Sequence, residues 1–526
     1  MSANSSITRS AILLTLTGGV EFGLQMAIPM IFVRHLEPST FGQYRLLWLM
    51  AGTALAIAPA FMPQSLFYFL PRAKQGQKGL VIGNVLAYLA VASCVVALIC
   101  SSWNPLLPNV IRKLFIDTNG LSAIFLGSWV LVSVMNVLPI AEGRIRWQSN
   151  SNICLAIFRT LLLAAAAIFT HNIVWVVAAM LVEALTRVTM LLLYLITRPS
   201  GGNISAQFNS MKKQISYSLP FACGNAFFLL RIQADQWVVA SMLPAALFAI
   251  FSIGAVFLPV STLIRQPLIN AMMPRLNNAY ANGDFDEIRR LIGKSSAATA
   301  IMLVPVAGAM FAVTPELVQI IYTERYVGAI PIMHIYLVGM MMNVFAVGHI
   351  LPALDKGRFA AGNNACCLVI SIVCSVIGAS QWGLIGAAFG SVFTFAISEL
   401  WSLKVVARTL GIGVHELMPW RAITQSLLGT WIGVGGVKLL AEMMHGTTLS
   451  ILALKGLAFL IFFTGIFLAL GGKKQLRLLL GHRSGPSNRR TDRNILWKND
   501  ETAVTPSGPA STKGSNDAKR ISPRQQ

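Results

Sequence analysis

Long apolar runs, few charged side chains and an alternation of basic loops predict an all-α polytopic membrane protein with about 14 transmembrane helices. Hydrophobic residues make up 55% of the 526-residue chain and charged residues only 11%, against roughly a quarter charged in soluble proteins. A helix needs about 20 mainly apolar residues to cross the hydrocarbon core, and most of the chain consists of such runs. A soluble enzyme is therefore excluded.

The predicted spans divide the chain into four parts. The spans lie at about 8–33, 42–70, 80–102, 120–141, 151–170, 173–197, 215–241, 245–272, 293–314, 328–350, 359–380, 383–405, 421–441 and 449–471. Spans one to six form an N-terminal lobe (1–200), and spans seven to twelve form a C-terminal lobe (201–410). Two additional spans occupy 411–471, followed by a basic cytoplasmic tail (472–526). The tail is polar and rich in Pro and Ser, so we expect it to be disordered.

The distribution of basic residues predicts how the chain crosses the membrane. The net charge is +22, which by itself would suggest nucleic acid. However, the loops on one side carry 17 Lys and Arg and those on the other side carry four. Because basic loops face the cytoplasm, we expect both termini in the cytoplasm and the protein in a bacterial inner membrane. No nucleic-acid partner is expected.

The remaining sequence signals predict neither a cleaved leader nor a bound metal. The first apolar run, 7–33, is too long for a signal peptide and another span follows at once. All seven cysteines lie inside apolar runs, without the spacing of metal ligands. We therefore expect no cofactor.

Two stretches of the sequence resemble each other. In the first, Pro38 opens a short loop, a long apolar helix follows, and the helix leaves the membrane at Pro71 and Arg72. In the second, the same order runs from Pro244 to Pro274. Both copies cross the membrane in the same direction. The sequence therefore predicts two parallel halves related by an axis along the membrane normal.

With these features the chain resembles the polysaccharide transporters, which are the O-antigen and exopolysaccharide flippases of the multidrug/oligosaccharidyl-lipid/polysaccharide exporter superfamily. The resemblance rests on RHLEPSTFGQY at 34–44, FSIGA at 251–255 and MPR at 273–275. It implies two six-helix lobes in a V around a central cavity. It also implies a flippase that moves an undecaprenyl-diphosphate-linked oligosaccharide across the inner membrane by alternating access, for lipopolysaccharide or exopolysaccharide synthesis.

Ionisable side chains inside the predicted spans are candidates for the transport site, because burying a charge at membrane depth is costly. The candidates are Glu21, Arg159, Glu183, Arg187, Arg231, Asp235, Arg265 and Glu399. The guanidinium fork matches the oxygens of a diphosphate, so Arg231, Arg187, Arg159 and Arg265 are expected to bind it. Polar side chains would bind the sugars, and these are Gln25, Gln64, Asn225, Gln233 and Asn343.

Each candidate also has a structural interpretation. Glu183 with Arg187 and Arg231 with Asp235 are spaced i, i+4, so each pair could neutralise itself on one helix face. Arg159 could extend to the interface, and Arg265 has similar alternatives. Glu399 is expected at the interface, and His334 is expected to be a packing residue.

Two other functions remain open. A cation-coupled multidrug antiporter of the same superfamily would use Asp235 or Glu21 with Na⁺ or H⁺, although arginines at depth disfavour a cationic drug. A membrane polysaccharide polymerase or ligase is less consistent with the sequence, because the longest predicted outer loop, 102–119, offers no His and no paired carboxylates. The protein is therefore expected not to be an enzyme. Its expected partners are the lipid-linked oligosaccharide, membrane lipids and other polysaccharide-assembly proteins. The sequence fixes neither the sugar, nor the coupling ion, nor the oligomeric state.

Overall fold

A computed structural model describes residues 2–74, 76–105, 107–197, 204–443, 446–473 and 475. Within these residues the regular structure is helical and no β-strand occurs, so the all-α fold class is confirmed. In the part of the chain that the structure describes, ten helices are long and apolar enough to span a membrane, and an eleventh span results if the bent pair α2–α3 counts as one. The number of 14 spans stays a prediction. The basic tail lies outside the described residues, apart from its first few positions.

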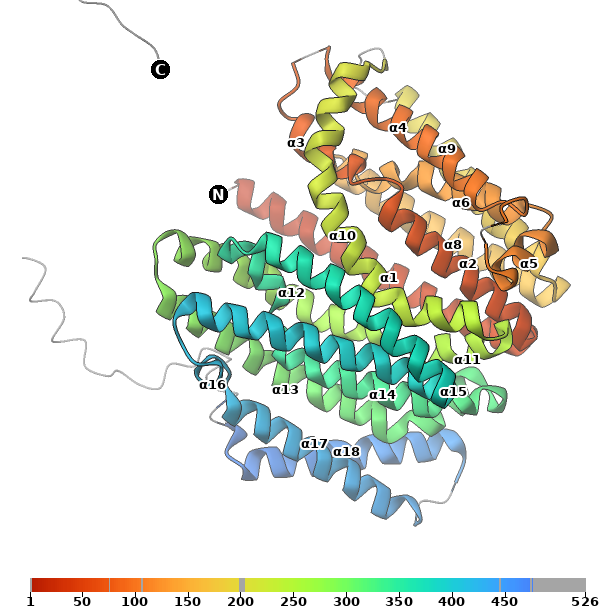
Figure 1. Cartoon of the computed structure of the whole chain (residues 1–526). Coiled ribbons are helices and arrows are strands. Elements are labelled where there is room, and N and C mark those ends of the chain that lie inside the picture. The colour runs from red at the N-terminus through yellow and green to blue at the C-terminus, as the bar shows by residue number, and fades with distance from the viewer. Residues whose placement is uncertain are drawn as a thin grey trace, which may run out of the picture. The chain divides into compact units, whose positions relative to one another are not determined.

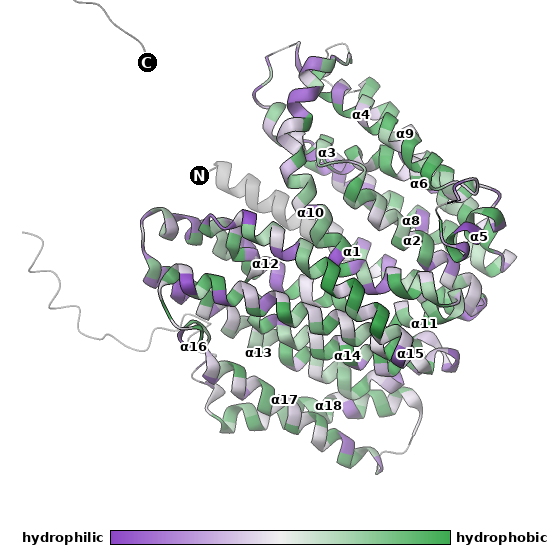
Figure 2. Cartoon of the chain, in the orientation of Figure 1, coloured by the Kyte–Doolittle hydropathy of each residue, from purple (hydrophilic) through white to green (hydrophobic). Residues whose placement is uncertain are grey.

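The first nine helices form one bundle (Figure 1). They are α1 (Ser2–His35), α2 (Pro38–Ile57), α3 (Met62–Phe69), α4 (Lys78–Ile99), α5 (Asn109–Asp117), α6 (Leu121–Leu131), α7 (Leu138–Ala141), α8 (Ile145–Thr170) and α9 (Ile173–Thr197). α1 packs on α8, and α6 packs on both α4 and α9. Figure 2 shows hydrophobic residues along most of the length of α4, α6 and α9.

A second bundle follows. It consists of α10 (Phe208–Met242), α11 (Ala245–Gly254), α12 (Leu258–Ala281), α13 (Phe285–Leu317), α14 (Ile330–Met341), α15 (Gly357–Leu410) and the short α16 (Val414–Leu417). The last helices, α17 (Trp420–Ala441) and α18 (Thr448–Ala469), pack on each other and on α13. The domain boundaries given from the sequence, at 200/201 and 410/411, stay predictions.

Prolines and glycines determine where several helices begin, end or turn. Pro38 occupies the first turn of α2, where its missing N–H is not needed. Asp284 caps the start of α13, and its side chain accepts a hydrogen bond from the backbone N–H of Glu287 at 2.9 Å. Gly383 divides α15 into two antiparallel halves with φ 61° and ψ −137°, a conformation that only glycine adopts readily. The predicted boundary between spans eleven and twelve lies at this position.

The two bundles meet closely at the end of the helices that carries Arg34, which is the predicted outer end. α2 packs against α11, and Gly42 lies so close to Ala245 that a Cβ at Gly42 would be 1.8 Å from the Ala245 carbonyl oxygen. Arg34 donates hydrogen bonds to the carbonyl oxygens of Ile320 (2.5 Å) and Ile321 (3.2 Å) in the second bundle. The bundles are therefore joined at this end.

Candidate functional site

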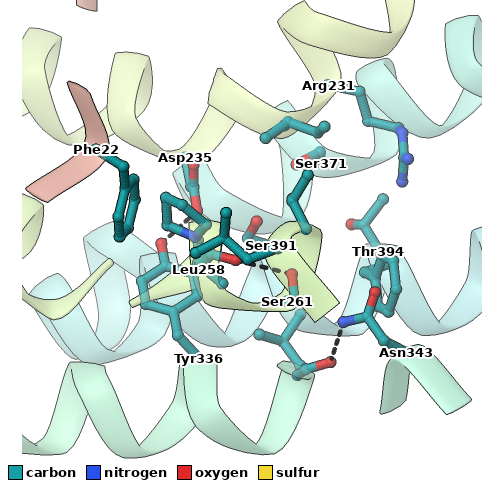
Figure 3. Close-up of a pocket in the computed structure, with 17 residues that line it drawn as sticks. Phe22, Arg231, Asp235, Leu258, Ser261, Tyr336, Asn343, Ser371, Ser391 and Thr394 are labelled. Carbon is teal, nitrogen blue, oxygen red and sulfur yellow. Dashed lines mark hydrogen bonds between the residues drawn. The ribbon is translucent and has the colours of Figure 1, made fainter. Parts of the chain in front are cut away.

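A cavity of about 530 Å³ lies among α10, α12, α14 and α15 of the second bundle, with Phe22 of α1 contributing from the first (Figure 3). Most of its lining is apolar, from residues such as Leu258 and Val392. Its polar groups are Arg231, Asp235, Ser261, Thr262, Tyr336, Asn343, Ser371, Ser391 and Thr394. An apolar cavity with a few converging polar groups is the usual form of a ligand site.

Arg231 is the cation of this cavity. It is only 7% exposed, and its guanidinium carbon lies 5.7 Å from the centre of the Phe228 ring. Its Nε has no hydrogen-bond partner among the described residues. A buried guanidinium N–H without a partner is costly. This group is therefore the part of the site that is most in need of an anionic or carbonyl ligand.

Asp235 lies one helical turn beyond Arg231 on α10, and its hydrogen-bond partners do not include Arg231. Its carboxylate accepts a hydrogen bond from the Tyr336 hydroxyl of α14 and one, at 2.7 Å, from the backbone N–H of Gln236. Among the described side chains no ion pair joins it to Arg231. The structural interpretation of this pair, self-neutralisation on one helix face, is therefore wrong.

Arg265 and Glu399 lie beside the cavity and bond to the backbone at the end of α14. Arg265 donates to the side chain of Asn343 (2.7 Å), a lining residue, and to the carbonyl oxygen of Ala346 (3.1 Å). Glu399 is 9% exposed and accepts hydrogen bonds from two backbone N–H groups. The carboxylate is therefore buried and bonded between helices, and its expected interfacial position stays a prediction.

The other two arginines form a separate cluster in the first bundle. Arg187 pairs with Glu183 through Nε and Oε1 at 2.6 Å, and Glu183 is only 1% exposed. The Arg187 guanidinium also lies over the Trp129 ring, and that of Arg159 lies over the Trp48 ring. The two tryptophans contact each other with centroids 5.5 Å apart. The pairing expected from this i, i+4 spacing is confirmed, and the role of Arg187 in binding a diphosphate stays a prediction.

The structure thus brings some of the candidates together and leaves others apart. Arg231 and Asp235 share the cavity, with Arg265 reaching it through Asn343. Arg159, Glu183 and Arg187 belong to the cluster in the first bundle. Glu21 is half-buried and Gln25 is exposed on α1, and neither lines the cavity.

Sequence reasoning missed several groups of the site. Tyr336, Ser371 and Thr394 line the cavity, but uncharged polar residues in apolar runs carry no signal of depth or direction. Arg45 lies outside the cavity, and it was detectable because it is a charged residue near the start of predicted span two. Its side chain donates to the carbonyl oxygen of Ser252 at 3.4 Å and so bridges the bundles. Among the described residues no group of three or more His, Cys, Asp or Glu could hold a metal ion.

Comparison with known proteins places this architecture in a class, that of multi-pass membrane proteins built like flippases and multidrug transporters. A solved structure of the lipid II flippase MurJ in an inward closed conformation superposes with a TM-score of 0.69 at 12% identity, over 87% of this chain and 99% of that chain. An inward-facing multidrug resistance transporter of the MATE family and MOP superfamily gives 0.56 at 13% identity, over 74% and 94%. A Vibrio cholerae MATE transporter gives 0.52 at 13% identity, over 78% and 98%. No curated protein matches the sequence.

The family follows from the sequence itself. The model of the family described as "Polysaccharide biosynthesis protein" matches residues 31–331. This match covers more than half of the chain and includes α2 through the start of α14. The chain therefore belongs to the polysaccharide biosynthesis protein family, which confirms the resemblance noted in the sequence, and it has the fold of the MOP-superfamily transporters.

Proposed function

We propose that this protein is a flippase that moves an oligosaccharide linked to undecaprenyl diphosphate across the bacterial inner membrane during polysaccharide synthesis. The observation that carries the proposal is Arg231, a buried guanidinium with an unpartnered Nε on the wall of a cavity among membrane helices. An arginine matches two phosphate oxygens at once. The membership of the polysaccharide biosynthesis family supports a sugar-bearing substrate.

The residues around Arg231 suggest how such a substrate would be divided. The diphosphate would bind Arg231, with Arg265 at the edge of the cavity. The first sugars would meet hydroxyl and amide groups such as Asn343, Ser391 and Thr394, which line the same space. The prenyl chain would stay in the bilayer, because each of its methylene groups is more stable outside water. No bond is broken, so the protein acts as a transporter and not as an enzyme.

Alternating access would move this cavity from one side of the membrane to the other. The hydrogen bonds of Arg34 and the approach of Gly42 to Ala245 join the bundles at the predicted outer end. The excess of basic residues in the opposite loops favours the cytoplasm for that other side. In this state the site would therefore take its substrate from the cytoplasmic leaflet, and both termini would be cytoplasmic.

The test is flipping of a labelled lipid by the purified full-length protein. Proteoliposomes would carry a fluorescent undecaprenyl-diphosphate oligosaccharide, and an impermeant reductant added outside would bleach the label in the outer leaflet. Arg231→Gln removes the charge and Arg231→Lys keeps the charge without the fork. We expect a loss of about 10- to 100-fold for Gln, the range for charged hydrogen bonds, and a smaller loss for Lys.

The matched control is Arg290→Gln, because Arg290 is 64% exposed and pairs with Glu287 at a helix surface. The control should flip at the wild-type rate. Wild-type flipping by Arg231→Gln, in protein that is folded by its elution and melting, would overturn the assignment of this site. No flipping of any diphosphate-linked lipid by the wild type would overturn the function.

Asp235 favours a second candidate, a cation-coupled multidrug antiporter, because a buried carboxylate beside the cavity could exchange a drug for Na⁺ or H⁺. Arg231 opposes it by repelling a cationic drug in a medium of low dielectric constant. Efflux of a cationic dye from the same proteoliposomes, driven by an imposed Na⁺ or H⁺ gradient, separates the two candidates. Dye efflux without lipid flipping would favour the antiporter.

A further inference from the structure

The membrane helix that continues from α14 is broken beside the cavity. α14 ends at Met341 and a 3-10 turn, Met342–Phe345, follows. Ala346 then leaves the helical region (φ −75°, ψ 105°), and Val347 (φ −116°, ψ 0°) leads into a second 3-10 segment, Gly348–Leu354. The break lies within the apolar stretch Glu324–Leu354, which is long enough to span a membrane. Backbone groups released by such a break need new partners.

Two charged side chains from other helices supply these partners. Arg265 of α12 donates from Nη2 to the carbonyl oxygen of Ala346 at 3.1 Å. Glu399 of α15 accepts at Oε2 from the backbone N–H groups of Val347 (3.0 Å) and Gly348 (3.2 Å). The released carbonyl is thus bonded to a guanidinium, and the released N–H groups are bonded to a carboxylate.

The fit around Glu399 is close. A Cβ added at Gly348 would lie 3.4 Å from Glu399 Oε1 and 3.4 Å from the Ser402 hydroxyl. Ser402 belongs to a buried network with Asn363, whose amide donates to it at 3.3 Å. The carboxylate is therefore held between the break and this network and has little freedom to leave.

The same carboxylate also lies beside a cation of the site. Arg265 and Glu399 bond to adjacent residues of the break, Ala346 and Val347, and Asn343 links Arg265 to the cavity wall. Glu399 also acts electrostatically on Arg231. An anionic ligand that enters the cavity must share these two positive charges with Glu399. Two anions competing for one set of cations each weaken the binding of the other.

We propose that Glu399 is a positioning residue that braces the break after α14 and, by competing for Arg231 and Arg265, keeps the diphosphate releasable. The inference rests on the proposed function and deepens it. Without this carboxylate charge the cavity would bind a diphosphate more tightly and release it more slowly. Such affinity would not help a transporter, because a tightly bound diphosphate is released slowly and slow release limits the rate of each cycle.

Glu399→Gln separates the two roles, because the amide oxygen still accepts a backbone hydrogen bond while the charge is lost. The full-length protein in nanodiscs would be titrated with undecaprenyl diphosphate and, for comparison, undecaprenyl monophosphate. We expect Glu399→Gln to bind the diphosphate about 5- to 150-fold more tightly, the usual range of coupling between sites. The same variant should flip the labelled lipid several-fold more slowly than the wild type. Glu399→Asp, which keeps the charge, should restore flipping in part.

Opposite changes in affinity and rate distinguish this role from a merely structural one. A structural residue would lose binding, flipping and melting temperature together, and that outcome in Glu399→Gln would overturn the inference. Unchanged affinity would overturn it as well. The control is Glu287→Gln, a carboxylate 35% exposed on α13 and outside the cavity, which should change neither quantity.

Hydrogen exchange tests the brace without any ligand. Glu399→Ala should raise the exchange of the Val347 and Gly348 amides, and Glu399→Gln should leave them largely protected. Equal protection in all three proteins would overturn the bracing role. If wild-type protein bound no undecaprenyl diphosphate, the proposed function and the competition would both fail. If the wild type bound undecaprenyl diphosphate and the Glu399 variants did not differ from it in affinity or flipping rate, this inference alone would fail.

Discussion

The contact between Gly42 and Ala245 makes the closed end of the bundles sensitive to one methyl group. The Cβ of Gly42→Ala would lie 1.8 Å from the Ala245 carbonyl oxygen and 2.5 Å from its carbon. Ordinary van der Waals contact begins at 3.4 Å, so the methyl group is about 1.6 Å too close. Both obstructing atoms belong to the backbone and cannot rotate away. α2 and α11 must therefore separate by a distance of that order.

The cost follows from measurements of overpacked cores. Extra methyl groups in well-packed sites cost about 1–3 kcal/mol, and each 1.4 kcal/mol is a factor of about ten. Gly42→Ala should therefore shift the equilibrium away from the closed outer end by about 5- to 150-fold. Flipping should fall, because a transporter that favours one state completes fewer cycles.

The assay is a distance measurement across the predicted outer end. Spin labels would replace Ser39 and Arg325, which are exposed on the first and second bundles respectively. Attachment through p-acetylphenylalanine leaves the seven native cysteines in place. Gly42→Ala should move the distance distribution to longer values. Gly435→Ala on α17, where nothing lies within 4 Å of the new Cβ, is the control. A wild-type distribution in Gly42→Ala would refute the reasoning.

Three further changes test the packing of charges and glycines. Glu183→Gln should lower the unfolding free energy by about 3–5 kcal/mol in a detergent melt, since it leaves the partly buried Arg187 without its partner at 2.6 Å. Adding Arg187→Gln should recover part of the loss, and a Glu183→Gln protein as stable as the wild type would contradict this. Glu316→Gln should lower the melting temperature by several degrees, because it removes the 2.6 Å ion pair with Lys455 that joins α13 to α18. The double exchange Glu316→Lys with Lys455→Glu should restore the melting temperature. Gly378→Ala should also lower the melting temperature, because its Cβ would lie 2.2 Å from a carbonyl oxygen in the opposing half of α15; an unchanged melt would show that the hairpin can open.

The sequence predicts features that depend on neighbours along the chain and misses those that depend on distant ones. Apolar length alone predicts the helical membrane fold, and the i, i+4 spacing of Glu183 and Arg187 offered their ion pair as one of two alternatives. The same spacing fails for Asp235. Its hydroxyl donor, Tyr336, lies 101 residues away, and no local pattern indicates that the two would meet.

The break after α14 shows the same limit. The predicted span 328–350 is mainly apolar, contains no Asp, Glu, Lys or Arg, and is consistent with one continuous helix. The backbone leaves the helix at Ala346 because Arg265 and Glu399, from two other spans, stabilise the released groups. Until those spans are packed, a charge in each is only a candidate for the site. The site could thus be predicted as a set of residues but not as a set of partners.

The attachment of α17 and α18 has a consequence for how motion of this protein can be followed. Both helices pack on α13, and the Glu316–Lys455 pair fastens α18 there. If the bundles rotate against each other, these two helices move together with the second bundle. The second bundle would then experience the larger viscous drag in the bilayer, so the first bundle would rotate through the greater angle. A fluorophore on α18 would therefore report the smaller rotation, and a fluorophore on α9 would report the larger one.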